Sequence, residues 1–80
     1  MDQYYVELAE ALRDRLAIIA DHQLREQNPE AHLLKLREAS ERIEDLRKRL
    51  PRDADPTLDH YLRRMSLSKA LEFVDKYCLG

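Results

Sequence analysis

Two proline-marked boundaries divide this 80-residue chain into helical segments. Asn28-Pro29 and Asp55-Pro56 each place a side chain that can cap an α-helix directly before a proline. The cap accepts hydrogen bonds from the first free amides of the helix, and proline supplies a φ angle suited to its first turn. The only glycine is Gly80, so no glycine turn lies inside the chain. The sequence therefore predicts helices that begin at these two points, and little other structure.

Length and composition indicate one small domain, residues 1–80. A chain of this length buries only about 60% of the surface that its unfolded form exposes, close to the lower limit for independent folding. Apolar residues make up 44% of the chain, which is normal for a globular protein, whereas the charged fraction of 38% is high. This balance favours long helices with one solvated face.

The sequence contains no run of about 18 apolar residues, so no membrane span is predicted. Its first residues do not form a basic segment followed by an apolar one, and no signal peptide is predicted. Cys78 is the only cysteine and cannot form a disulfide within the chain, which favours a reducing compartment. By elimination, we expect a cytoplasmic protein.

The first predicted helix, residues 2–27, has an unusually wide apolar face. Its main stripe follows helical spacing and consists of Tyr5, Leu8, Leu12, Leu16 and Ile19. Further apolar residues flank this stripe, with Val6, Ala9, Ala17, Ala20 and Leu24 on one side and Tyr4, Ala11 and Ile18 on the other. A surface helix usually carries an apolar stripe a little over 100° wide. We therefore expect this helix to contact more than one neighbour.

The second predicted helix, residues 29–50, carries a narrow apolar seam. Its members follow the alternating spacing of a coiled coil and are Leu36, Ala39, Ile43, Leu46 and Leu50. Because only one or two residues separate this helix from the first, the two should form an antiparallel hairpin. On the charged face we expect i,i+4 ion pairs, namely Glu38–Arg42, Glu44–Lys48 and Asp45–Arg49.

Residues 56–78 show two apolar faces about half a turn apart. The first holds Leu58, Tyr61, Leu62 and Met65, and the second runs from Leu67 to Cys78. Ser66 and Ser68 lie at the change of face, and serine is a good N-cap. The simplest interpretation is two short helices, 56–65 and 67–78; the alternative is one long helix that touches two bodies. The predicted fold is all-α, an antiparallel helical hairpin plus one kinked or two short C-terminal helices in a small bundle.

We predict no catalytic, cofactor-binding or metal site. The carboxylate pairs Glu10/Asp14, Glu41/Asp45 and Asp53/Asp55 lie on solvent faces or in a linker, without the apolar pocket that shifts a catalytic pKa. His22 and His32 should meet at one end of the hairpin as partly exposed side chains, with too few converging ligands for a metal. Cys78 is interpreted as a small buried apolar residue and not as a nucleophile. We therefore expect no enzymatic activity.

The wide face of the first helix predicts an interaction or structural module that forms a homodimer. One short chain has little else to cover both flanks, and an exposed apolar patch of that size is uncommon on soluble monomers. Isologous dimers are the commonest assemblies, so the partner should be a second copy, or else another helical protein. Tyr4, Ala11 and Ile18 are the predicted dimer contact.

The alternative hypothesis is a nucleic-acid-associated protein. A basic surface between the second and third helices would supply the contacts, through Arg42, Arg47, Lys48, Arg49, Arg52, Arg63 and Arg64. No aromatic residues are interleaved with these side chains, and Glu44 and Asp45 lie among them. The net charge of −2 also disfavours this hypothesis, because nucleic-acid binding depends on excess positive charge.

Overall fold

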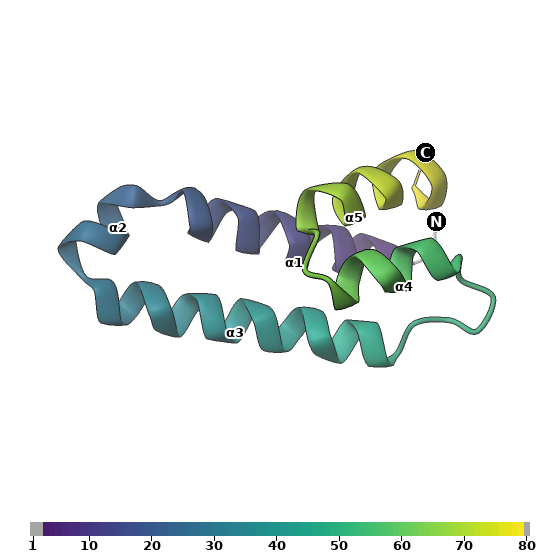
Figure 1. The fold of residues 1–80 in the computed structure, drawn as a ribbon, viewed down its shortest axis with the longest axis horizontal. Coiled ribbons are helices and arrows are strands. Elements are labelled where there is room, and N and C mark those ends of the chain that lie inside the picture. The colour runs from purple at the N-terminus through teal and green to yellow at the C-terminus, as the bar shows by residue number, and fades with distance from the viewer. Residues whose placement is uncertain (1–2, 80) are drawn as a thin grey trace.

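A computed structural model describes residues 3–79, and all regular structure in that range is helical (Figure 1). The elements in chain order are α1 (Gln3–Ala20), α2 (His22–Gln27), α3 (Pro29–Lys48), α4 (Pro56–Arg63), α5 (Leu67–Phe73) and the π-helical turn η1 (Val74–Cys78). Helices α1 and α3 form an antiparallel hairpin, and α4 and α5 pack together at one end of it. The predicted all-α hairpin with two short C-terminal helices is confirmed.

Both proline-marked boundaries begin helices. The side chain of Asn28 accepts a hydrogen bond from the Ala31 amide at 3.2 Å, and that of Asp55 accepts one from the Thr57 amide at 2.9 Å. Pro29 and Pro56 follow in the first turn, where the missing amide proton costs no helical hydrogen bond. Local side-chain chemistry is therefore sufficient to place these two starts.

The first helix is not continuous over residues 2–27, so that part of the prediction is wrong. Helix α1 ends at Ala20, and the Asp21 carboxylate caps α2 by accepting a hydrogen bond from the Leu24 amide at 3.0 Å. A short carboxylate inside a helical run can bond to nearby amides and so compete with the helical ladder. Asp21 therefore acts as a second N-cap, although no proline marks it.

His32 lies beside this break and is only 6% exposed, which corrects the prediction of a partly exposed histidine. Its Nε2 lies 2.9 Å from the carbonyl oxygen of Ile18, so the ring N–H donates to a carbonyl in the last turn of α1. A buried polar ring needs such a partner. His32 therefore links α3 to α1 near the tip of the hairpin. His22 lies exposed at the start of α2.

A residue in the left-handed region ends α4. Met65 has a φ of 56°, the only positive φ among the described residues. The Ser66 amide donates to the Tyr61 carbonyl at 2.9 Å, and the Met65 amide donates to the Leu62 carbonyl at 3.2 Å. These two bonds form a Schellman motif, in which glycine usually occupies the left-handed position. Ser66 is the N-cap residue of α5 but makes no side-chain capping bond, so the turn depends on Met65.

Replacing Met65 with glycine should stabilise the protein by about 0.5–1 kcal/mol. A residue with a Cβ atom pays about 1–2 kcal/mol in this conformation, and the greater freedom of glycine in the unfolded chain offsets part of the gain. Urea unfolding measures the difference. Met65→Ala removes the same side-chain atoms but keeps the Cβ, so equal stabilisation by alanine would exclude backbone strain as the cause.

The core lies at the end of the hairpin where the C-terminal helices pack. Helix α1 contributes Leu8, Ala9, Ala11 and Leu12, and α3 contributes Ile43 and Leu46; the later elements add Leu58, Leu62, Leu67, Ala70 and Val74. The predicted seam of α3 is buried at its centre, while Leu36 and Leu50 are half-buried. One side of α1 faces α3 and another faces α5 and η1, which accounts for much of its wide apolar face.

The other end of the hairpin extends beyond the C-terminal helices (Figure 1). We call residues 16–36 the arm and the remaining described residues the head. The head combines α4, α5 and η1 with the first turns of α1 and the last turns of α3. The arm has a single layer, in which the end of α1 and α2 lie beside the start of α3. The described part of the chain is 42 Å long and only about half as wide, at 22 × 21 Å. No helix in it is long and apolar enough to cross a membrane.

Candidate functional site

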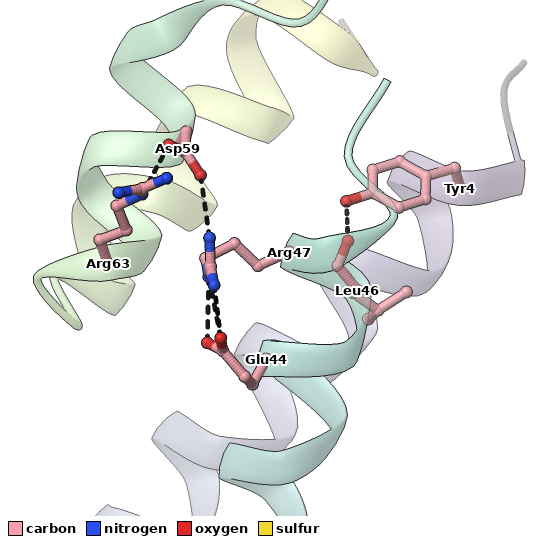
Figure 2. Close-up of polar contacts among 6 residues, drawn as sticks. All are labelled: Tyr4, Glu44, Leu46, Arg47, Asp59 and Arg63. Carbon is pink, nitrogen blue, oxygen red and sulfur yellow. Dashed lines mark hydrogen bonds and ion pairs between the residues drawn. The ribbon is translucent and has the colours of Figure 1, made fainter. Parts of the chain in front are cut away.

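Three of the seven residues of the predicted basic surface form ion pairs. Figure 2 shows the Arg47 guanidinium between Glu44 and Asp59, with Nη2 2.5 Å from Glu44 and Nη1 3.6 Å from Asp59. Arg63 also reaches Asp59, with Nε at 2.8 Å. The hydrogen bonds from Arg47 lower the pKa of the Glu44 carboxyl. This network joins α3 to α4 and leaves two of the predicted cations neutralised.

Arg42 is also paired, but with a different helix from the one predicted. Its guanidinium lies 3.1 Å from Asp14 and 3.8 Å from Glu10, both on α1. Within residues 3–79 none of the three predicted i,i+4 pairs of α3 is formed: Arg42 pairs with α1 and Glu44 pairs with Arg47, while Lys48, Asp45 and Arg49 form no ion pair. Four predicted nucleic-acid contacts are exposed without an ion pair to any described residue: Lys48, Arg49, Arg52 and Arg64.

The three predicted dimer residues are at least partly covered by the chain itself. Ala11 is 1% exposed in the core, and Tyr4 is half-buried with its hydroxyl donating to the Leu46 carbonyl (Figure 2). Ile18 is half-buried in a groove between α1 and α3 that Lys35, Glu38 and Arg42 also line. Ala11 therefore offers almost no surface to a partner.

The largest exposed apolar side chains of the hairpin lie on the arm instead. Leu33 is 66% exposed and Ile19 is 43% exposed. Ile19 lines a surface pocket of about 360 Å³ together with Leu16 and Met65, where the arm meets the turn between α4 and α5. We call the surface formed by Leu16, Ile19, Leu33, Leu36 and Met65 the arm face.

Helical spacing places Leu33 on the same side of the hairpin as Ile19. Arg15 Nε donates to Ser40 Oγ at 2.8 Å, which shows which residues of α1 and α3 lie side by side. Leu33 and Leu36 lie two turns and one turn before Ser40 on α3, while Ile19 lies one turn after Arg15 on α1. Arg47 continues this line of α3 and contacts α4. The arm face is therefore the continuation of the face that α4 and α5 cover in the head.

Opposite charges lie at the two ends of the arm face. The tip, residues 21–30, carries Asp21, Glu26 and Glu30 with one full cation, Arg25. Around the turn between α4 and α5, residues 63–69 include Arg63, Arg64 and Lys69 and contain no acid. Arg63 is paired with Asp59, whereas Arg64 and Lys69 have no ion pair among the described residues.

The side chains considered for catalysis do not form a reactive group. The predicted carboxylate pairs are all exposed, and no cluster of three metal-ligating residues occurs among residues 3–79. Cys78 is half-buried, and its burial together with the negative charge of Asp55 raises the pKa of the thiol. A raised pKa lowers the thiolate fraction, which is the opposite of what a nucleophilic cysteine needs.

Comparison with protein-family models, curated proteins and solved structures gave no match for this chain.

Proposed function

We propose that this protein is a small helical assembly module that forms a homodimer through the arm face. The observation that carries the proposal is the exposure of Leu33 and Ile19 on the side that α4 and α5 cover in the head. The arm lacks the second helical layer that the head has. A second arm would supply two helices in that place and would complete a four-helix arrangement.

Charge complementarity favours a second copy as the occupant. In an antiparallel twofold dimer, each arm tip meets the turn between α4 and α5 of the partner. The acidic tip, with Asp21, Glu26 and Glu30, then lies against Arg64 and Lys69. Because the symmetry repeats this contact, one complementary pair of surfaces is used twice. Charged groups arranged in this way select the partner and its orientation.

Sedimentation equilibrium tests the dimer. The wild type should have about twice the 9.5 kDa mass of one chain at micromolar concentration. Leu33→Arg should shift the mass toward one chain without loss of helicity, because it places a charge in the apolar contact. Leu34→Arg is the matched control, since Leu34 is 54% exposed but lies 100° further around α3, away from the arm face.

Two outcomes would overturn this arrangement. A wild type that stays monomeric at high concentration excludes the dimer. If Ile18→Arg dissociates the dimer and Leu33→Arg does not, the contact lies on the opposite side of the hairpin, with Tyr4 and Ile18. Lys69→Glu tests the charges separately, because it should weaken the dimer and reduce its dependence on salt.

Nucleic-acid binding is the weaker proposal. It rests on Lys48, Arg49, Arg52 and Arg64, which are exposed on the last turn of α3, the linker and the end of α4. Three of the seven predicted contacts are neutralised by neighbouring carboxylates. A salt-dependent mobility shift on adding single-stranded or duplex nucleic acid would favour this function over self-association alone.

A further inference from the structure

A second surface lies at the far end of the head, away from the arm. It is a pocket of about 550 Å³ between the first turn of α1, the linker before α4, and η1. The lining residues that matter for its chemistry are Tyr5, Phe73, Tyr77, Asp53, Asp55 and Cys78. A pocket of this volume is within the range of small-molecule sites. It shares no residue with the arm face.

Aromatic rings form the apolar part of this pocket. The ring centroids of Phe73 and Tyr77 are 4.9 Å apart, with the planes inclined by 49°. Tyr77 is 65% exposed, so most of this side chain is open to a ligand from solvent. The ammonium of Lys76 lies 5.3 Å from the Tyr77 ring centroid. Lys76 lines the neighbouring pocket and not this one, so the contact shows that the Tyr77 ring can accept a cation–π contact but supplies no cation to the pocket itself.

The polar part of the pocket is negative. Asp53 and Asp55 line it, no cationic residue does, and neither carboxylate has an ion pair among residues 3–79. One oxygen of Asp55 accepts a hydrogen bond from the Thr57 amide, which holds this carboxylate in place. The negative charge of Asp55 also acts inside the pocket, because it helps to raise the pKa of Cys78.

Aromatic walls combined with unpaired carboxylates match one ligand class. We propose that this pocket binds an organic ammonium ion, such as a methylated alkylamine. The rings attract the diffuse charge and methyl groups through their faces, and the carboxylates supply the opposite full charge. Anions would be repelled by the two carboxylates. A metal ion would find only two carboxylates and a protonated thiol, fewer hard ligands than Ca²⁺ or Mg²⁺ requires.

Titration of the ¹⁵N-labelled protein with choline, followed by two-dimensional NMR, tests the proposal. Saturable shifts should cluster at Asp53, Asp55 and residues 73–78. The neutral isostere 3,3-dimethyl-1-butanol has the same shape without the charge and should leave these signals almost unchanged. Equal responses to both compounds, or shifts scattered over the surface, would overturn the proposal.

Two variants and one control locate the site. Tyr77→Ala should weaken choline binding roughly threefold to tenfold, as expected for loss of one ring. Asp53→Asn should also weaken it, whereas Asp45→Asn, which removes the same charge on the exposed face of α3, should not. If Asp45→Asn weakens binding as much as Asp53→Asn, the attraction is only that of net charge and the site is refuted.

A second titration identifies the source of the cation. A short peptide that contains trimethyllysine should bind more tightly than choline if the natural ligand is a protein side chain. Equal affinity of both probes indicates a free small amine. Failure of both probes refutes the ammonium site and leaves the dimer untouched, because the two surfaces share no residue.

Discussion

Ile43→Asp should unfold the protein at room temperature. Ile43 is 2% exposed and lies at the centre of the contact between α3 and α1. An unpaired carboxylate buried there costs several kcal/mol. A domain of this length has a total free energy of unfolding of only about 4–12 kcal/mol. Far-UV circular dichroism should show loss of most helical signal, and any residual structure should melt without a cooperative transition.

The control for this variant is Glu41→Asp. It introduces the same residue type into the same helix, at a position that is exposed and has no ion pair among the described residues. Its cost should be limited to helix propensity, a few tenths of a kcal/mol. Glu44 is less suitable as a control, because its carboxylate is bonded to Arg47. An Ile43→Asp protein that melts like the wild type would show that this position is not in the core.

The second large effect is expected from Ala9→Arg. Ala9 is fully buried and lies one turn before Arg13, whose guanidinium pairs with Asp75 of η1 at 2.9 Å. Ala9 therefore faces α5 and η1, where an arginine side chain has no space. Overpacking and the burial of an unpaired charge should together remove most of the stability of the domain. Urea unfolding monitored by circular dichroism measures the loss.

Ala20→Arg is the matched control for this prediction. Ala20 lies about three turns after Ala9, on nearly the same face of α1, but it is exposed on the arm. The same substitution should leave helicity and the unfolding midpoint nearly unchanged there. If both variants unfold, the wide apolar face of α1 is needed along its whole length. If neither does, α5 and η1 do not cover Ala9 in solution.

Much of the fold could be predicted because its signals are local. Asn28 and Asp55 cap helices with their own side chains, and the spacing of Ala39, Ile43 and Leu46 marks the buried face of α3. Such features depend on residues within a turn or two, so periodicity and capping rules detect them. Asp21 shows the limit of these rules. Its capping bond to Leu24 is equally local, but without a following proline the carboxylate resembled any other polar residue of an amphipathic helix.

The candidate sites depended on information that is not local. The wide apolar face of α1 predicted a dimer contact because no sequence rule showed that α3 would cover the flank with Tyr4 and Ala11, and α5 and η1 the flank with Ala9. Arg42 and Arg47 belonged to the predicted basic surface because carboxylates that pair with them, Glu10, Asp14 and Asp59, lie on other helices. The end pocket joins residues from both ends of the chain and from the linker. Nothing in the spacing of these residues indicated that they would meet.

The sequence by itself determined the helices, two of their starts and the buried seam of α3, because caps and periodicity act within a few residues. Only the tertiary structure decided which part of α1 is covered and which charges remain unpaired. Both depend on where α4 and α5 lie on the hairpin. That placement follows from the Met65 turn, which joins the two helices, and from long-range packing of the Leu58–Val74 side of the core. Alanine at position 9 and alanine at position 20 are chemically identical. The first is core and the second is surface, because a distant helix covers only one of them.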